Sequence, residues 1–503
     1  MALRPTSVPL DVPLPAPPES SLPAVPDPES DRALAASPTV SHLLATSVAD
    51  PYFETASASA LVAELLEFAA ACRLDYATAL VAESASACPS SIEGTYVDEV
   101  PPPGANIVNG MWIFRVKQPL GSPPAFKARY VARGFRQRQG VDYFQTFSPT
   151  PKMISLRVLL HVAAQRNYEL HSLDFSTAFL QGSLHEEIWL RRPPGFTGSF
   201  PAGTQWSLRR PNNGLRQAPR EWHNTLRTTL AALGLAPSTA DPSLFLRTDT
   251  SLPPFYVLLY VDDLVFASID TEALTLVKSE LQKRHTCTDL DYLVLQLPVL
   301  LATAHSSVYR PLALSSTFGR VCRAECKSGM GLVLGGRGPV VLCGHAEASW
   351  VEDSATQRSS QGYTFSLGSG SVSWRSTSSS SVLNSSCEAE IYVEAMAAQE
   401  LRWLTYLLTD LGEQPHSPPV LYVYNKAMIA LCQEHRLEHR TKHIALRYFL
   451  ARELQQCGQL RLAYVATRAN NVDLFTKALS PVDHQHFSTV LGLVPTLPHL
   501  LTA

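Results

Sequence analysis

The chain has 503 residues, of which 45% are hydrophobic and 17% are charged, and its formal net charge is −3. This length allows about three domains of ~150 residues, and the hydrophobic share is ordinary for a globular protein, so the composition excludes a wholly disordered or fibrous chain. The charge is unevenly spread: residues 1–105 carry a net −11, residues 106–289 a net +7 and the remainder a net +1. The basic middle segment indicates a channel that binds phosphate groups, and so nucleic acid, largely without regard to sequence.

The N-terminal segment differs in composition from the rest. Residues 1–50 are rich in Pro, Ser and acidic residues, which predicts a disordered linker. Residues 51–94 are rich in Ala and Leu at helical spacing, which predicts one or two helices. The first ten residues lack the apolar core of a signal peptide, and the longest apolar run, 292–304, is too short for a membrane span and contains Pro. Nine cysteines without a C-x-x-C pair favour an intracellular, non-secreted protein with reduced thiols.

Acidic residues follow two predicted strands in the middle of the chain. Residues 168–174 alternate between apolar and polar side chains, which predicts a strand that ends at Asp174. The apolar stretch 254–267 predicts two further strands, with Asp262 and Asp263 at the tip of the hairpin between them. Because two adjacent carboxylates repel each other, we expect a hard divalent cation such as Mg²⁺ to neutralise them. For an Asp-Asp pair alone, an ordinary acidic turn would be the better interpretation.

Five short strings in this region carry a family resemblance. They are KARYVARGF, DYFQTFSP, LDFSTAFLQGSL, GLRQAPREW and YVDD, and they occur in this order. Each is weak alone, but five in register over residues 106–290 are specific. Together they resemble the reverse transcriptase of copia-type LTR retrotransposons, which is encoded within a Gag-Pol polyprotein. The resemblance implies an RNA-directed DNA polymerase with a right-hand α+β fold of fingers and palm. It also implies an RNA template, a DNA primer, their hybrid and dNTPs as partners, in a cytoplasmic virus-like particle or the nucleus.

The resemblance assigns the three aspartates to catalysis. Asp174 and Asp262 would hold two Mg²⁺ ions, with Mn²⁺ as the alternative metal, and Asp263 would be the third carboxylate of the site. In such a site one ion lowers the pKa of the primer 3′-hydroxyl, and the other stabilises the departing pyrophosphate.

Four further residues receive roles from the resemblance. Phe179 matches the aromatic residue that lies under the incoming sugar and excludes a 2′-hydroxyl, although core packing explains a Phe there equally well. Gln217 would contact the incoming nucleotide or the template. Lys127 and Arg129 would meet the triphosphate, whose oxygens need charged donors, although basic strands are commonly just solvated faces.

The chain departs from the family after the polymerase motifs. Fingers and palm would occupy residues 95–290, whereas residues 291–328 are unfamiliar and stand as an aberrant remnant of the thumb and connection. Asn213 also stands where the family usually has Tyr. We expect this truncated thumb to weaken the binding of primer and template. These departures indicate a decayed genomic copy or a mis-spliced gene.

Residues 329–485, followed by a tail at 486–503, resemble the family's RNase H domain, an α/β fold. The carboxylates that match are Glu347, Glu390 and Asp473, but Glu347 replaces a shorter Asp. Tyr424 stands in place of a fourth carboxylate and cannot bridge metal ions as a carboxylate does. We therefore expect RNase H activity to be lost or severely impaired.

Two other patterns invite a metal site. His435, His439 and His443 are spaced as on one helix face, and Cys322 and Cys326 lie four residues apart. Short matches of this kind give many false positives, so we interpret both sets as structural.

The resemblance therefore favours a copia-type RNA-directed DNA polymerase with an RNase H-like domain whose activity is lost or severely impaired. The alternative is a catalytically inert, decayed remnant that only binds nucleic acid. A nuclease alone is less favoured, because Tyr424 affects that very activity.

Overall fold

The computed structural model describes residues 94–117, 125–193, 201–292, 295–302, 309–313, 330–336, 339–353, 356–383, 385–433 and 450–495. All of these residues lie in the compact unit that begins at Thr78. The predictions made for residues 1–93, for the two cysteines at 322 and 326, and for the three histidines at 435–443 lie outside the described ranges. Within these ranges no helix is both long and apolar enough to cross a membrane.

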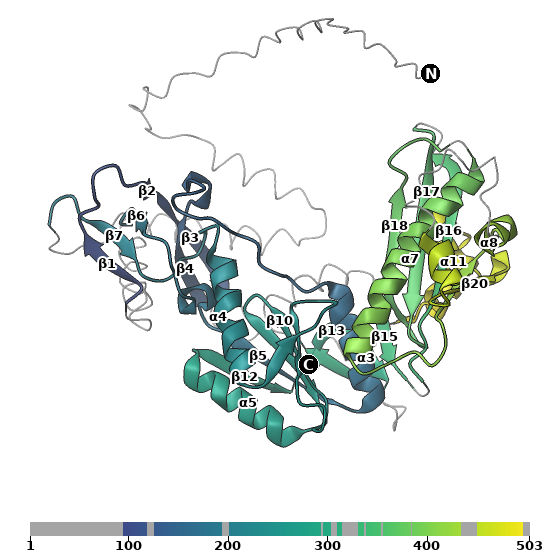
Figure 1. The fold of residues 1–503 in the computed structure, drawn as a ribbon, viewed down its shortest axis with the longest axis horizontal. Coiled ribbons are helices and arrows are strands. Elements are labelled where there is room, and N and C mark those ends of the chain that lie inside the picture. The colour runs from purple at the N-terminus through teal and green to yellow at the C-terminus, as the bar shows by residue number, and fades with distance from the viewer. Residues whose placement is uncertain are drawn as a thin grey trace, which may run out of the picture. The chain divides into compact units, whose positions relative to one another are not determined.

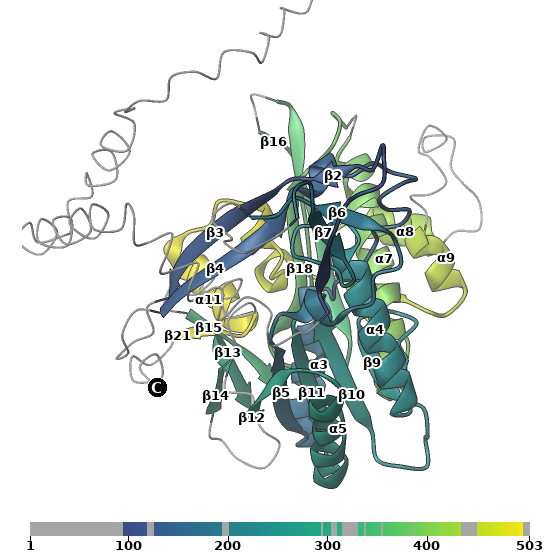
Figure 2. The ribbon, with the colours of Figure 1, turned by 90° about the vertical axis from the view of Figure 1, so that its left-hand side faces the viewer.

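Two small sheets form the predicted fingers. One has the strand order β1-β7-β6-β2, and the other is the hairpin of β3 and β4, which Figure 2 shows as a long blue ribbon pair. In the first sheet Val108, Ile188 and Leu208 are buried in a shared core. The strands are β1 (Tyr96–Glu99), β2 (Ile107–Val108), β3 (Gly110–Lys117), β4 (Ala125–Ala132), β6 (Ile188–Leu190) and β7 (Gln205–Leu208).

A six-stranded sheet with the order β12-β5-β11-β10-β9-β8 forms the palm. Its strands are β5 (Glu169–Phe175), β8 (Leu235–Pro237), β9 (Leu244–Arg247), β10 (Phe255–Tyr260), β11 (Asp263–Ser268) and β12 (Cys287–Tyr292). Its helices are α3 (Met153–Arg166), α4 (Ala218–Ala232) and α5 (Thr271–Arg284). Successive residues of a strand face opposite sides, so Leu264 and Phe266 pack with α4 and α5, whereas Val265 and Ala267 pack with α3. Figure 1 shows α4 and α5 beside β5 and β12.

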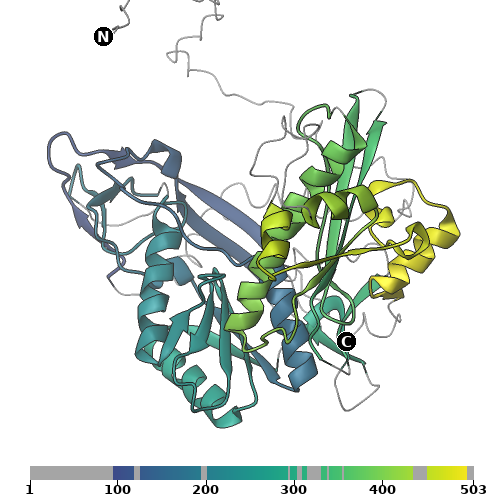
Figure 3. The ribbon, with the colours of Figure 1, turned by 45° about the vertical axis from the view of Figure 1, so that its right-hand side comes forward.

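The RNase H-like region contains a five-stranded sheet with the order β18-β17-β16-β19-β20. Strands β16, β19 and β20 are parallel, and β17 and β18 are antiparallel to their neighbours. The long helix α7 packs on β16 and β17, as Figure 3 shows in green. The strands are β16 (Cys343–Asp353), β17 (Arg358–Ser366), β18 (Ser371–Ser378), β19 (Val420–Val423) and β20 (Arg461–Tyr464). The helices are α7 (Ser386–Asp410), α8 (Lys426–Gln433), α9 (Leu450–Gln456), α10 (Asp473–Thr476) and α11 (Pro481–Val490).

A further four-stranded sheet has the order β14-β13-β15-β21. Its strands are β13 (Leu295–Ala302), β14 (Tyr309–Ala313), β15 (Met330–Gly335) and β21 (Leu493–Pro495). Strands β13 and β14 come from the segment predicted as a thumb remnant, and β21 from the predicted tail. Strand β13 of the remnant therefore pairs with β15 of the RNase H-like region, while the predicted domain boundaries stay a prediction.

Side chains of the palm and of the RNase H-like region share one buried apolar cluster. It includes Leu159 of α3, Leu258 of β10, Phe365 of β17 and Leu404 of α7. Hydrogen bonds join the same parts: the Tyr256 hydroxyl donates to the carbonyl of Leu411 at 2.7 Å. Asp410 accepts from the backbone N–H groups of Thr239 at 3.0 Å and Ala240 at 3.2 Å. The predicted α+β fold of palm and fingers followed by an α/β RNase H-like region is confirmed.

Candidate active site

Strand pairing brings the three predicted aspartates together. In the antiparallel pair of β5 and β11, Asp263 lies directly opposite Asp174. Asp263 also pairs with Tyr260 of β10, so only Val261 and Asp262 form the turn of the hairpin. The prediction placed both aspartates at the tip, whereas the structure makes Asp263 the first residue of β11. This shift of one residue puts Asp263 next to the strand that carries Asp174.

The chemistry of these oxygens fits a hard divalent cation. Asp263 is 3% exposed, and the buried Oδ1 of Asp262 has no hydrogen-bond partner among the described residues. A buried carboxylate oxygen without a partner is costly unless a cation approaches it. Across the described ranges no group of three or more His, Cys, Asp or Glu side chains is arranged so that it could hold a metal ion by itself. Mg²⁺ commonly takes only one or two protein carboxylates and completes its shell with water and phosphate oxygens, so the aspartates fit this ion.

The turn between the strands has an unusual backbone. Val261 has a φ of +56°, which is a genuine outlier for a β-branched residue. Two hydrogen bonds hold the turn: the indole Nε1–H of Trp222 donates to the carbonyl of Val261 at 2.5 Å, and the N–H of Phe175 donates to the carbonyl of Asp262 at 2.7 Å. Both carbonyls of the turn are thus fixed by neighbouring elements.

Phe179 lies close to the carboxylates along the chain. It belongs to the short 3-10 helix Ala178–Gln181, which follows Thr177 in a left-handed conformation with a φ of +53°. The ring is half-buried and packs against both the palm core and the fingers core. This position agrees with core packing and leaves part of the ring accessible, so its contact with a sugar stays a prediction.

The two basic residues predicted to meet the triphosphate lie on β4. Lys127 pairs with Arg115, and Arg129 pairs with Ile113 in the β3–β4 hairpin. Arg129 is exposed. Their contact with a nucleotide stays a prediction.

Gln217 is the predicted site residue with the least access to solvent. Its side chain is 0% exposed. Its Nε2 donates to the carbonyl of Asp142 at 2.8 Å, and its Oε1 accepts from Nε2 of Gln137 at 3.0 Å. In this arrangement the amide ties the start of α4 to residues 137–142. A contact with nucleotide or template, which stays a prediction, would require these bonds to rearrange.

A second acidic cluster lies in the RNase H-like region. Glu347 lies on β16, Glu390 in the first turns of α7 and Asp473 at the start of α10, and each is at most 5% exposed. Lys477 donates to Glu347 at 2.5 Å and to Asp473 at 3.1 Å. The Nδ2 of the buried Asn470 donates to the same two carboxylates, at 2.7 and 3.2 Å. Three of the four predicted positions are therefore brought together.

Burial shifts the titration of this cluster. Burial, assisted by the bond to Asp473, raises the pKa of Glu347 to about 7. Burial and the charge of Glu347 raise the pKa of Glu390 to about 8. Burial likewise raises the pKa of the fully buried Glu394, one turn further along α7, well above its ordinary value. Carboxyl groups with raised pKa values are common at functional sites, but buried structural groups behave in the same way.

Tyr424 follows β19 at the edge of this cluster. The preceding residue, Val423, pairs with Ala346, the neighbour of Glu347. The Tyr424 side chain is 44% exposed, and its ring lies 6.3 Å from that of Tyr464. The position predicted for a fourth carboxylate is thus beside the cluster, and it carries an aromatic ring.

Several residues with a clear place in these sites were missed from the sequence. In the sequence, Trp222 is only the last residue of the string GLRQAPREW, and no motif assigns a role to Asn470, Lys477 or Glu394. For Lys477 the spacing to Asp473, one helical turn, was an available signal. The bonds of Trp222 and Asn470 join residues 39 and 123 positions apart, so no local pattern indicates them.

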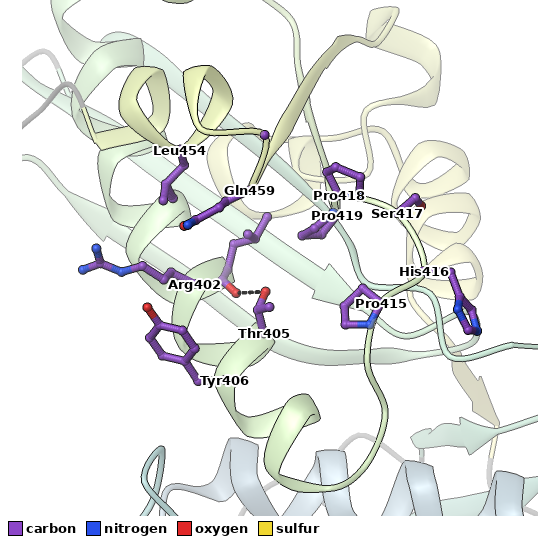
Figure 4. A pocket seen from close by; sticks show the side chains of 12 residues that line it. Arg402, Thr405, Tyr406, Pro415, His416, Ser417, Pro418, Pro419, Leu454 and Gln459 are labelled. Atoms are coloured by element: carbon purple, nitrogen blue, oxygen red, sulfur yellow. Dashed lines mark hydrogen bonds between the residues drawn. The ribbon is translucent and has the colours of Figure 1, made fainter.

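A pocket of about 350 Å³ lies elsewhere, between α7, α9 and the loop before β19. Figure 4 shows Arg402 and Tyr406 on one side and Pro415 and His416 on the other. None of the predicted site residues lines it. It therefore adds nothing to either acidic cluster.

Comparison with known proteins agrees with the predicted family. Residues 95–309 match the family described as reverse transcriptase (RNA-dependent DNA polymerase). The chain is 32% identical over 477 residues to the retrovirus-related Pol polyprotein from transposon RE2 of Arabidopsis thaliana, covering 79% of this chain and 33% of that protein. It is 26% identical over 473 residues to the Pol polyprotein from transposon TNT 1-94 of Nicotiana tabacum, covering 77% of this chain and 36% of that protein. The chain thus spans about a third of the length of these relatives.

Among solved structures, the foamy viral protease-reverse transcriptase in complex with RNA/DNA hybrid matches 75% of this chain and 52% of its own. The sequence identity is 11% and the TM-score is 0.40, which is too low to carry an assignment.

Proposed function

Since the chain is related to the Pol polyproteins of copia-type retrotransposons and its residues 95–309 belong to the reverse transcriptase family, we propose that these residues extend a DNA primer along an RNA template. The observation that carries the proposal is the pairing of Asp263 with Asp174 at a hairpin whose turn presents Asp262. The reaction joins a dNTP to the primer 3′-hydroxyl and releases pyrophosphate.

Asp174 and Asp262 would hold two catalytic Mg²⁺ ions, with Asp263 as the third carboxylate. When bound, these ions would lower the pKa of the primer hydroxyl and stabilise the charge on the phosphate oxygens. The aspartates supply hard oxygen ligands from two adjacent strands and a turn, which gives the ions a fixed position. The exposed Arg129 on the fingers hairpin would supply a positive charge to the triphosphate, whose oxygens need charged donors.

The test is dNTP incorporation on a primed RNA template with Mg²⁺. We expect the wild-type chain to extend the primer and the Asp262→Asn/Asp263→Asn variant to lose extension at least about a thousandfold, as expected when electrostatic stabilisation of the transition state is removed. Asp249→Asn, in the exposed turn after β9, is the matched control and keeps activity. Salt-dependent binding of the hybrid without extension by any folded variant would instead identify a binding remnant.

We further propose that the RNase H-like region does not cleave the hybrid. Support comes from Tyr424 beside the acidic cluster and from Lys477, whose ammonium group already contacts two of the three carboxylates. The test is degradation of an RNA–DNA hybrid by the full chain with Mg²⁺ and with Mn²⁺. We expect no cleavage by the wild-type chain and partial recovery in Tyr424→Asp/Glu347→Asp. Robust wild-type cleavage would refute this part of the proposal.

A further inference from the structure

The hairpin that carries Asp262 and Asp263 receives a hydrogen bond from helix α4. Trp222 lies in α4, is 1% exposed, and donates its indole N–H to the carbonyl of Val261 at 2.5 Å. Val261 is the first residue of the two-residue turn and has the left-handed φ of +56°. A residue held in such a conformation costs about 1–3 kcal/mol and persists only where its surroundings enforce it.

The surroundings of Trp222 make it a rigid donor. Its ring meets the ring of Phe175 edge-on, with centroids 4.9 Å apart, and that of His285 at 5.6 Å. The rings of Phe175 and His285 meet at 5.8 Å, so the three rings form a closed triangle. His285 is also hydrogen-bonded to Thr229 of α4 at 3.0 Å. Close packing on two sides restricts the rotation of the indole ring and favours an N–H that is directed at the turn.

The triangle connects the turn to the strand that carries Asp174. Phe175 follows Asp174, and its own N–H donates to the carbonyl of Asp262 at 2.7 Å. Two residues of this aromatic cluster thus fix both carbonyls of the turn. The indole N–H of Trp222 binds the carbonyl of Val261, and the backbone N–H of Phe175 binds the carbonyl of Asp262. The orientation of the peptide planes on either side of Asp262 follows from these two bonds, and with it the direction of the Asp262 side chain.

We propose that Trp222 is a positioning residue for the polymerase metal site: its indole N–H holds the strained turn at Val261 and so aims Asp262 at the metal. The inference rests on the proposed function, since it assigns Trp222 a role in that same site. It predicts that losing the N–H lowers metal affinity and catalytic rate while the binding of dNTP is little changed.

The experiment compares the full chain with Trp222→Phe, which keeps an aromatic ring and removes the N–H. We expect kcat to fall about tenfold, which corresponds to one hydrogen bond of ~1.4 kcal/mol, with KM for dNTP within about twofold. The Mg²⁺ concentration for half-maximal rate should rise by a similar factor. The control is Trp206→Phe, which changes a buried tryptophan of β7 in the fingers in the same way. It should leave kcat and the Mg²⁺ concentration for half-maximal rate unchanged.

A second-site change separates positioning from packing. Glycine adopts a positive φ without strain, so Val261→Gly removes the strain that the Trp222 bond opposes. We expect Val261→Gly to restore most of the lost rate to Trp222→Phe. A purely structural role would give an additive or larger loss in the double variant. If Trp222→Phe does not fold, benzothienylalanine at position 222, which keeps the shape of the ring and lacks the N–H, gives the same comparison.

Binding of Mn²⁺ to the full chain, measured by electron paramagnetic resonance, is a readout that does not need polymerase activity. Weaker Mn²⁺ binding in Trp222→Phe than in the wild type supports the inference even in a chain that does not polymerise, in which case only the proposed function fails. Unchanged Mn²⁺ affinity in the folded variant overturns the inference and leaves the proposed function standing.

Discussion

Substituting Glu390 by Gln should stabilise the protein, and increasingly so as the pH rises. Glu390 is 5% exposed, and its buried Oε2 has no hydrogen-bond partner within the described part of the chain. Its pKa is about 8 in the folded protein against 4.5 for an ordinary glutamate. Between these two values the unfolded chain releases a proton that the folded protein retains, so the free energy of unfolding falls as the pH rises.

The size of this effect follows from the difference of about 3.5 between the two pKa values. Each unit is worth about 1.36 kcal/mol, which sets an upper bound of about 5 kcal/mol above pH 8. Local relaxation around the charged carboxylate reduces it. We therefore expect the advantage of Glu390→Gln to grow by about 2 kcal/mol between pH 6 and pH 9, which is about 4–8 °C in melting temperature for a domain of this size.

The assay is the melting temperature of the full chain in EDTA at pH 6, 7, 8 and 9, measured by circular dichroism. Glu453→Gln, an exposed glutamate of α9 in the same region, is the control and should follow the wild type. If the curves for Glu390→Gln and the wild type ran parallel across this range, Glu390 would not retain its proton in the folded protein, and the reasoning would be wrong.

Two further changes test contacts that hold the palm. Lys278 is buried and donates to Asp289 and to the ring of His171. Lys278→Met should therefore lower the melting temperature by several degrees, with little dependence on salt because the ion pair is shielded from solvent. An unchanged melting temperature would contradict this. Asp410→Ala removes the acceptor for two backbone N–H groups of the turn before β9 and should lower the free energy of unfolding in urea by about 1–2 kcal/mol. The control Thr409→Ala, at the neighbouring position on α7, should lower it much less. Equal losses would show that the bonds of Asp410 contribute nothing specific.

The elements of the palm are well predicted from local sequence. The aromatic and branched residues of 255–260 specify β10, and the alternation of apolar and polar residues in 168–174 specifies β5. The proximity of Asp174 to Asp262 and Asp263 can therefore be predicted from the sequence. The direct pairing of Asp174 with Asp263 cannot be predicted in this way, because the register depends on how two strands distant in the sequence pair.

The surroundings of the predicted site residues could not be derived in the same way. Gln217 and Lys477 are both polar residues of motifs, and each would be expected at a surface. The structure buries the amide of Gln217 among bonds to residues 137–142 and joins Lys477 to a β16 carboxylate 130 positions away. Such contacts arise from tertiary packing, to which neither propensity nor periodicity is sensitive.

The pairing of β5 with β11 also sets how much change in length this region tolerates. Removing one residue between Leu170 and Asp174 would turn the Asp174 side chain to the opposite face of the sheet, away from Asp263. An insertion in the two-residue turn at Val261 would displace Asp262 by disturbing the hydrogen bonds that Trp222 and Phe175 donate to the carbonyls of the turn. The exposed turn around Asp249, by contrast, is free to gain or lose residues without moving any of the three aspartates. Gene copies that keep a polymerase should therefore vary in length at that turn and remain invariant in length at β5 and at the hairpin.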